Sequence, residues 1–305
     1  MAIKVFIDGE YGTTGLQIHQ RLAEQNNIKL ISIDFQDRHN ITAKKAILDK
    51  VDVAILCLPD QAAVETVKLL SDNDHIRIID ASTAHRTNNN WIYGFAEMCR
   101  DQKKLIQEAK FISNPGCYAT GAIALIRPLT ENNIIPANFP FNIHAVSGYT
   151  GGGKELIKEM QLDNHLNYFT YNMHGGHKHL PEITKYSLLK NTPIFTPSVG
   201  SFPQGMLVCI SLNLAMLETN YNVSLIKEIY TSHYANQNFI SIATDDEINN
   251  ISRLNPADFI NRDDLKIYIF PQKDQQQILL VAQLDNLGKG AAGAAVQNLE
   301  LMFNH

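Results

Sequence analysis

The sequence predicts an α/β protein in which a doubly wound parallel-sheet domain is joined to an α+β domain. Three observations support this prediction. The chain has 305 residues, about twice the length of a typical domain. Its first half alternates apolar runs with amphipathic stretches, a rhythm typical of β-α-β units. The apolar runs are continuous and rich in Ile and Val, which indicates strands that are covered on both faces.

The first half contains five apolar runs that are predicted to form the parallel strands. Two segments between them, 15–25 and 61–70, repeat apolar residues at helical spacing. Alternation of this kind places helices on both faces of one sheet. The predicted strands are 3–7, 29–33, 51–58, 76–80 and 110–113.

The second half has a different pattern, in which the predicted strands are longer and apolar runs alternate less often with amphipathic stretches. Residues 121–130 are predicted to form a helix and 206–215 a strand, while 267–284 form two antiparallel strands joined by a polar turn. The Gly/Ala-rich end of the chain is expected to form a helix that returns to the first domain. We therefore predict a first domain of residues 1–116 and 286–305, and a substrate and oligomerisation domain of residues 117–285.

The composition excludes several classes of protein. Hydrophobic residues make up 45% of the chain and charged residues 19%, and the formal net charge is -5, which argues against a nucleic-acid binder. No eighteen apolar residues run together, and the first residues lack the pattern of a signal peptide. The four cysteines form no CxxC pair, so we expect reduced thiols and a cytoplasmic protein.

A glycine-rich loop follows the first predicted strand. Gly9, Gly12 and Gly15 have the spacing GxxGxxG, and Thr13 and Thr14 add hydroxyl donors. An ordinary glycine turn is the alternative. Because the loop lies between a strand and a helix that opens a β-α-β unit, the sequence predicts a dinucleotide site there.

The choice between NAD and NADP stays open from these residues alone. Asp34 ends the second predicted strand, where an acidic residue would bind a ribose hydroxyl and favour NAD. Arg38 follows closely and would neutralise the 2′-phosphate of NADP, unless it is a solvated surface charge.

Cys117 is the predicted nucleophile. It lies in the segment SNPGCYATG (113–121), where an apolar strand ends, Pro and Gly force a turn and a helix begins. The positive end of a helix favours the thiolate, which is the form that attacks carbonyl groups. Cys57 and Cys209 lie inside apolar runs and are read as core residues.

Three histidines stand within six residues at 174–179, in the segment HGGHKH. A metal site is one interpretation, but no cysteine or carboxylate stands nearby at a familiar spacing, so we expect no metal. The other interpretation is a general acid/base on a loop before a helix that starts near Pro181. His179 is the first choice for this role, His177 is the second, and His174 reads as a surface residue.

Several segments together resemble the N-acetyl-gamma-glutamyl-phosphate reductase family, in its short (type 2) branch. They run from residue 7 to residue 302, and SNPGCY with a downstream HxHxPE is the most specific pairing. Aspartate-semialdehyde dehydrogenase is a broader relative. The segments are IDGEYGTTGLQI (7–18), DASTAHR (80–86), YGFAE (93–97), NPGCYATG (114–121), AVSGYTGGGK (145–154), GHKHLPEI (176–183) and LDNLGKGAAGAAVQNLELM (284–302).

The resemblance implies an NADP-dependent, aldehyde-forming oxidoreductase of arginine biosynthesis. Such an enzyme reduces N-acetyl-glutamyl 5-phosphate to N-acetylglutamate 5-semialdehyde and phosphate through a cysteine thioester. Cys117 matches the family's nucleophile and His179 its acid/base. Asn286 matches an asparagine near the nicotinamide, and the family's use of NADPH favours Arg38 as the partner of the 2′-phosphate.

Recognition of the substrate phosphate is less well defined by the resemblance. Longer relatives carry an arginine where this chain has Gln204. Arg86, Ser147 and Lys154 are the substitutes that we expect at the substrate, together with Asn114 beside the nucleophile; Arg86 could equally form a surface salt bridge.

Two alternative functions stay open. One is a sister acyl-phosphate reductase such as aspartate-semialdehyde dehydrogenase, and the other is a catalytically silent NADP-sensing binding protein. The expected partners are a small-molecule acyl phosphate and inorganic phosphate, with no nucleic acid and no membrane. The resemblance also implies a homo-oligomer, either a dimer or a tetramer.

Overall fold

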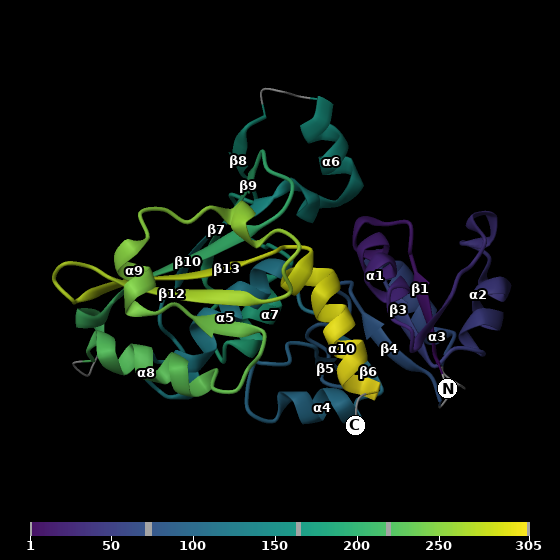
Figure 1. The fold of residues 1–305 in the computed structure, drawn as a ribbon, viewed down its shortest axis with the longest axis horizontal. Helices are drawn as coiled ribbons and strands as arrows, with labels where there is room; N and C mark the ends of the chain where they lie inside the picture. Colours follow the sequence, from purple (N-terminus) through teal and green to yellow (C-terminus); the bar gives the residue numbers. More distant parts are fainter. Residues whose placement is uncertain (1, 71–74, 163–165, 218–220, 304–305) are drawn as a thin grey trace. The chain divides into compact units, whose positions relative to one another are not determined.

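The computed structural model describes residues 2–70, 75–162, 166–217 and 221–303 (Figure 1). The chain forms two compact units. Unit 1 comprises Met1–Ala96, Asp101–Gly116 and Ala291–His305, and unit 2 comprises Glu97–Arg100 and Cys117–Gly290. Across the described residues, every helix is too short or too polar to cross a membrane.

Unit 1 is built on a six-stranded sheet with the strand order β2-β1-β3-β4-β6-β5, in which all neighbours pair in parallel. Parallel neighbours require crossover connections, and the helices of this unit supply them. The strands are β1 (Ile3–Asp8), β2 (Ile28–Ile31), β3 (Val53–Leu56), β4 (Arg77–Asp80), β5 (Ile92–Tyr93) and β6 (Phe111–Ser113).

Two hydrophobic clusters cover the two faces of this sheet. Successive residues of a strand point to opposite faces, so Val5 enters one cluster and Phe6 the other. The first cluster includes residues of α1 (Thr13–Ala23), α4 (Gln102–Glu108) and α10 (Gly293–Phe303), and the second includes residues of α2 (Ile41–Leu48) and α3 (Asp60–Lys68). Burial on both faces explains why the strand sequences are continuous apolar runs.

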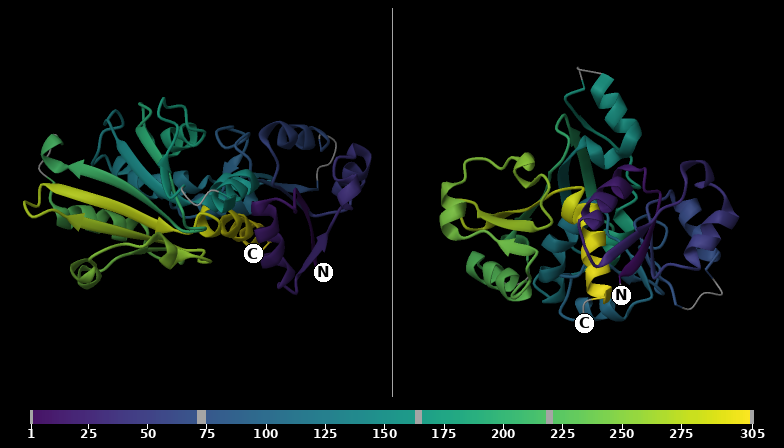
Figure 2. Two further views of the ribbon diagram at one scale, coloured as in Figure 1. Left: turned by 90° about the horizontal axis from the view of Figure 1, so that it is seen from above. Right: turned by 45° about the vertical axis from the view of Figure 1, so that its right-hand side comes forward.

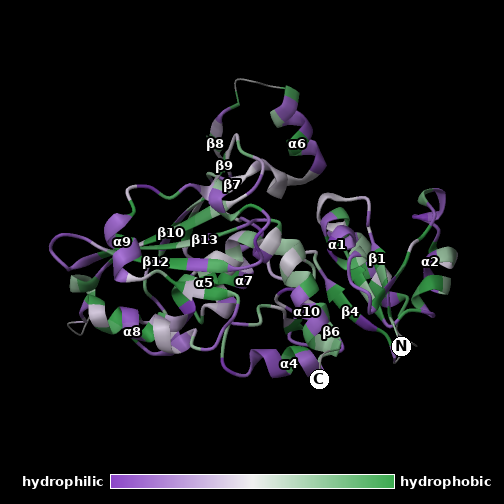
Figure 3. Cartoon of the chain, in the orientation of Figure 1, coloured by the Kyte–Doolittle hydropathy of each residue, from purple (hydrophilic) through white to green (hydrophobic). Residues whose placement is uncertain are grey.

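Unit 2 is built on a seven-stranded mixed sheet with the order β11-β12-β13-β10-β7-β9-β8. The long strands β10, β12 and β13 pair antiparallel, and Figure 3 colours much of β10 and β12 as hydrophobic. The strands are β7 (Asn142–Gly148), β8 (Tyr168–Thr170), β9 (Ile194–Gly200), β10 (Met206–Asn213), β11 (Ile240–Ile242), β12 (Leu265–Pro271) and β13 (Gln277–Leu284).

The helix α5 (Cys117–Glu131) packs against β10 and β13 of this sheet. A Cβ atom at Gly121 would lie 2.6 Å from a side-chain carbon of Val208, so the helix lies close to the strand at this glycine. The helices α7 (Leu180–Tyr186) and α8 (Val223–His233) contact α5 in turn, and further views of the ribbon are given in Figure 2. The remaining helices are α6 (Gly153–Leu162) and α9 (Asp245–Asn250).

The predicted fold class is confirmed, because a doubly wound parallel sheet and a mixed sheet with helices are both present. The two strands predicted within 267–284 are β12 and β13. The predicted helix at 121–130 begins four residues earlier, at Cys117. The units differ from the predicted division at two short segments, because Glu97–Arg100 and residues 286–290 group with unit 2.

Candidate active site

The glycine-rich loop of unit 1 leaves no room for side chains at its first and last glycines. Gly9 has a φ of +89°, and a Cβ there would lie 2.3 Å from the carbonyl oxygen of Cys57. A Cβ at Gly15 would lie 2.2 Å from the carbonyl oxygen of Gly9. Gly12 caps α1 without a side-chain hydrogen bond, and Thr13 and Thr14 form its first turn. Main-chain N–H groups at such a helix start suit a phosphate.

Arg38 lies beside an aromatic ring in the segment after β2, at the end of the short 3-10 helix Phe35–Asp37. Its guanidinium carbon is 3.7 Å from the ring centroid of Phe35, and its Nη1 donates to the carbonyl oxygen of the same residue. The ring of Tyr11, from the glycine-rich loop, meets Phe35 edge to face at 5.2 Å. The contact between Tyr11 and Phe35 brings the segment with Arg38 next to the glycine-rich loop. Asp34 is exposed.

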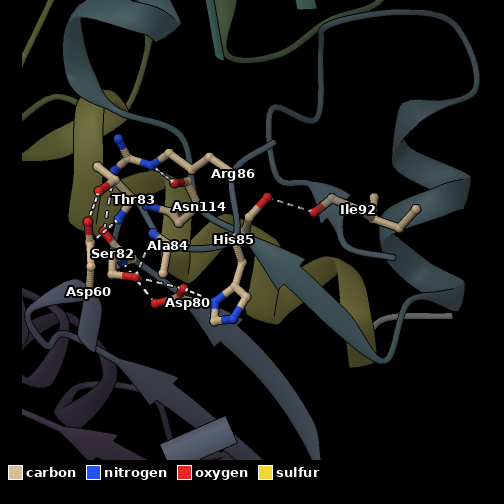
Figure 4. Close-up of polar contacts among 11 residues, drawn as sticks. Asp60, Asp80, Ser82, Thr83, Ala84, His85, Arg86, Ile92 and Asn114 are labelled. Atoms are coloured by element: carbon tan, nitrogen blue, oxygen red, sulfur yellow. Dashed lines mark hydrogen bonds and ion pairs between the residues drawn. The ribbon is translucent and has the colours of Figure 1, made fainter. Parts of the chain in front are cut away.

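The segment DASTAHR (80–86) folds around the buried carboxylate of Asp80, at the end of β4 (Figure 4). Its Oδ1 accepts from the main-chain N–H of Ser82 at 2.9 Å, and its Oδ2 accepts from the Ser82 hydroxyl at 2.8 Å. His85 Nδ1 lies 2.6 Å from Oδ2, and the His85 ring stacks on Trp91 with a centroid distance of 4.1 Å. This turn is therefore rigidly fixed.

Arg86 is buried and bonds to main-chain carbonyl groups. Its Nε donates to the oxygen of Asn114 at 3.0 Å and its Nη2 to that of Ala81 at 3.3 Å (Figure 4). Arg86 is only 7% exposed, so it is not the surface residue of the alternative interpretation. Its guanidinium holds the loop that precedes Cys117 in the chain.

Asn114 is held by its side chain within unit 1. Its Nδ2 donates to the carbonyl oxygen of Ala291 at 2.9 Å, and its Oδ1 accepts from Asn298 Nδ2 at 3.1 Å. Asn298 also donates to the carbonyl oxygen of Gly94 at 2.9 Å. These bonds fix the loop at Asn114, three residues before Cys117.

Cys117 is the first residue of α5, a helix of 15 residues, and its side chain is half-buried. The first turn of a helix carries four main-chain N–H groups without intrahelical acceptors and the positive end of the helix dipole, and this position favours the thiolate of Cys117. Gly290 packs directly against Cys117, since a Cβ at Gly290 would lie 2.7 Å from the Cys117 Cβ.

His179 immediately precedes α7 and is buried, and its carbonyl oxygen accepts from the N–H of Ile183 at 3.0 Å. Its ring centroid is 5.9 Å from that of Tyr118, the residue that follows Cys117. The tyrosine is itself fixed, because its hydroxyl donates to the carbonyl oxygen of Ser198 at 2.8 Å. Unit 2 therefore brings the predicted acid/base next to the residue that follows the predicted nucleophile.

Two tyrosines in this cluster were not found from the sequence. Burial, with Tyr171 and Cys117 as further causes, raises the pKa of Tyr118. Burial raises the pKa of Tyr171 to about 12, and the nearby charge of Cys117 adds to the rise. Both hydroxyl groups therefore stay protonated near neutral pH. The only signal in the sequence was their position, directly after Cys117 and six residues before His177.

Ser147 and Asn286 meet at a common glycine of unit 2. A Cβ at Gly151 would lie 3.3 Å from Ser147 Oγ and 3.5 Å from Asn286 Nδ2. Asn286 is buried, and its Oδ1 accepts from the N–H of Gly205 at 2.9 Å while its Nδ2 donates to Thr150 Oγ1 at 3.0 Å. Asn286 thus connects the loops at Gly205 and Thr150 by hydrogen bonds.

Lys154 and Gln204 lie in different surroundings. Lys154 is exposed in the first turn of α6. Gln204 donates from Nε2 to Asp285 Oδ2 at 3.2 Å. Burial raises the pKa of Asp285, and hydrogen bonds from main-chain N–H groups and from Gln204 oppose the rise. The side-chain amide of Gln204 therefore donates a hydrogen bond to a buried carboxylate.

No group of three or more His, Cys, Asp and Glu side chains suited to a metal ion occurs among the described residues. Unit 2 also has a polar cavity of about 680 Å³ beside α8. None of the predicted site residues lines this cavity, whose walls include Arg100, Glu131, Glu228, His233 and Gln237.

Two family models match the chain. Residues 14–106 match "Semialdehyde dehydrogenase, NAD binding domain", and residues 117–286 match "Semialdehyde dehydrogenase, dimerisation domain". Proteins of Brucella ovis and Brucella suis, each named N-acetyl-gamma-glutamyl-phosphate reductase, are 47% identical over 308 residues. The match covers 99% of this chain and 99% of each relative.

Solved structures of aspartate-semialdehyde dehydrogenases share the fold. The enzyme II of Vibrio cholerae, complexed with ASA, has a TM-score of 0.73 at 13% identity, with 99% of this chain and 98% of that chain covered. The Candida albicans enzyme with NADP has a TM-score of 0.66 at 14% identity, with 99% and 98% covered.

Proposed function

The chain belongs to the N-acetyl-gamma-glutamyl-phosphate reductases of the semialdehyde dehydrogenase family, and on this basis we propose a catalytic or binding role for each of its site residues. The enzyme reduces N-acetyl-glutamyl 5-phosphate to N-acetylglutamate 5-semialdehyde and phosphate, a step of arginine biosynthesis. The observation that carries the proposal is the position of Cys117 at the start of α5, with His179 packed against the ring of Tyr118.

The Cys117 thiolate attacks the acyl carbon of the substrate. The bond to the phosphate oxygen breaks, inorganic phosphate leaves, and a thioester forms on the sulfur. Main-chain N–H groups at the start of α5 stabilise the oxyanion that develops, an effect worth about 3–4 kcal/mol per donor in enzymes. His179 donates a proton to the oxygen of the reduced thioester, which gives a hemithioacetal. The hydroxyl proton returns to His179 as the C–S bond breaks, so the aldehyde leaves and the thiolate is restored.

The cofactor supplies a hydride when it is bound. Gly9, Gly12 and Gly15 fit its pyrophosphate, because two of these positions exclude a Cβ and the third starts α1 without a side-chain cap. Thr13 and Thr14 add donors at the same helix start. We assign NADP on the side chain of Arg38, which offers a positive charge beside the Phe35 ring.

The substrate residues divide into two groups. Arg86 donates to main-chain carbonyl groups, and Asn114 accepts from Asn298. Both residues thereby hold the loop before Cys117 in the geometry that attack requires. Ser147 contacts the substrate with its hydroxyl. Asn286, beside it, holds the loops at Thr150 and Gly205 by hydrogen bonds and contacts the nicotinamide. Lys154, exposed at the start of α6, attracts the negatively charged substrate.

The enzyme acts as a homo-oligomer in the cytoplasm. Leu207 and Cys209 alternate with residues of β10 that face α5, so they occupy the sheet face away from that helix, and both are half-buried. These two apolar side chains suit contact with a second copy, in a dimer or in a tetramer built from dimers. The four cysteines are free thiols, as a reducing compartment requires.

NADPH oxidation with N-acetyl-glutamyl 5-phosphate tests the assignment. The Cys117→Ser variant is expected to lose turnover and to keep its NADPH affinity, since the glycine-rich loop belongs to unit 1. Aspartyl phosphate serves as the competing substrate. Equal kcat/KM for both substrates would favour a broader reductase, and full activity of Cys117→Ser would contradict the nucleophile assignment. Equal loss of turnover and of NADPH binding would indicate a folding defect.

A further inference from the structure

His177 makes a hydrogen bond to the main chain of His179. Its Nδ1 lies 3.1 Å from the main-chain nitrogen of His179, which donates the proton. His177 is only 7% exposed, so little water reaches this bond. A ring nitrogen that accepts a hydrogen bond carries no proton of its own, so Nδ1 is unprotonated.

The other ring nitrogen of His177 faces a hydroxyl group. Nε2 lies 3.2 Å from the hydroxyl oxygen of Tyr171. A neutral imidazole with a bare Nδ1 carries its proton on Nε2, and it therefore donates to Tyr171. The two bonds specify one tautomer and engage both ring nitrogens. His177 in this state has no nitrogen left for proton transfer to a substrate.

Aromatic rings fix the plane of the His177 ring. The ring of Phe195 lies perpendicular to it at a centroid distance of 4.9 Å, and that of His179 meets it at 78° and 4.8 Å. Tyr118 meets it edge to face at 5.8 Å. The hydrogen bonds and the ring contacts together leave His177 one orientation, and through the main chain they fix the start of α7.

We propose that His177 is a positioning residue for His179. As a neutral imidazole protonated on Nε2, it accepts a hydrogen bond from the main-chain N–H of His179 and donates one to Tyr171. Tyr171 and Tyr118 are the tyrosines that lie near Cys117. His179 is thereby kept at the distance and angle at which it delivers a proton. The inference rests on the proposed acid/base role of His179, and it gives a separate function to His177, the second choice for that role in the sequence.

Three replacements at position 177 distinguish the two hydrogen bonds from ring packing. In His177→Asn, Oδ1 can take the place of Nδ1 as the acceptor. In His177→Gln, the amide nitrogen reaches the place of Nε2 and can donate to Tyr171. In His177→Phe, the ring remains and both bonds are lost. Tyr171→Phe removes the hydroxyl that accepts from Nε2, and with it the hydrogen bond between Tyr171 and Tyr118.

We expect kcat to fall about 100-fold in His177→Phe and no more than about 5-fold in His177→Asn, because misplacing an acid/base by about 1 Å costs rate on this scale. His177→Gln is expected to resemble the Phe variant, and Tyr171→Phe to lose about 5-fold. KM for the acyl phosphate and the affinity for NADPH are expected to change less than about 3-fold, because His177 acts on the reacting step alone.

Equal losses in the Asn and Phe variants would overturn the proposal, because restoring the acceptor for the main-chain N–H of His179 would then recover no activity. A Phe variant with wild-type kcat would also overturn it. If the Phe variant does not fold, the comparison of Asn with Gln decides between the two bonds. His179→Asn is the reference for the proposed function: if it keeps wild-type turnover, the acid/base assignment fails whatever the His177 series shows.

Discussion

The Nζ of Lys289 lies 2.6 Å from Oε2 of Glu97, and both side chains are buried, with exposed fractions of 2% and 0%. The ammonium group also lies 5.3 Å from the ring centroid of Phe239. Neither residue was a candidate from the sequence, although both belong to segments that carry the family resemblance. Lys289 immediately precedes Gly290, which packs against Cys117. The ion pair therefore anchors the π-helical turn Gly288–Ala292, which supports the nucleophile.

We expect Lys289→Met to destabilise unit 2 by about 3–5 kcal/mol, because it leaves the Glu97 carboxylate buried without its ion-pair partner. Urea denaturation followed by circular dichroism measures the change. The double variant Lys289→Met, Glu97→Gln removes both charges and is expected to recover part of the loss. A single variant with the wild-type free energy of unfolding would contradict the anchoring role of the pair.

A methyl group at Gly290 is expected to displace the nucleophile. The Cβ of Gly290→Ala would lie 2.7 Å from Cβ and 3.2 Å from Cα of Cys117, both closer than ordinary contacts. A shift of about 1 Å at the sulfur would lower kcat about 100-fold. Steady-state kinetics measures this effect, and NADPH affinity together with the melting temperature serves as the control. Unchanged kcat would show that the turn Gly288–Ala292, and not Cys117, moves to make room.

Much of the fold could be predicted because its physical causes are local. The strands of unit 1 are continuous apolar runs because Val5 and its neighbour Phe6 are buried on opposite faces of the sheet. The turn before Cys117 is marked by Pro115 and Gly116. The two-residue strand β5 was missed, since Ile92–Tyr93 is too short to show a period.

The candidate site was predictable only where a motif marks it. Cys117 and His179 stand in distinctive segments, whereas Tyr171 has no motif and meets His177 through the loop after β8. Gln204 and Asp285 are 81 residues apart and pair through a side-chain hydrogen bond. Contacts of this kind depend on how loops fold against each other, and no local pattern reports them.

The cofactor preference is expected to depend on Arg38. Arg38→Ala removes the charge that pairs with the 2′-phosphate, so we expect KM for NADPH to rise about 10- to 100-fold while KM for NADH hardly changes. Steady-state kinetics with both cofactors measures this difference. Lys50→Ala is a matched control, because it removes an exposed cation from the same unit. Equal rises in the KM for NADPH in both variants would show that Arg38 acts only through the overall charge of the unit and does not pair with the 2′-phosphate.

The cysteines are expected to react with iodoacetamide in an order set by their environments. Burial, with the charges of Asp80 and Asp8 as further causes, raises the pKa of Cys57 to about 12, and burial raises the pKa of Cys209 to about 11. A raised pKa favours the neutral thiol, so at pH 8 little of Cys57 is the reactive thiolate.

Cys117 stands at the positive end of α5, where the thiolate is favoured, so we expect it to be alkylated at least about 100-fold faster than Cys57 or Cys209 in the folded protein at pH 8. Mass spectrometry of digested samples measures the three rates separately. Raising the pH towards 11 is expected to increase labelling of Cys209 before that of Cys57. The Cys117→Ser variant gives the background, and denaturation in urea is expected to bring the rates of all three thiols together. Fast labelling of Cys57 in the folded wild type at pH 8 would contradict its assignment to the core and remove the basis for singling out Cys117.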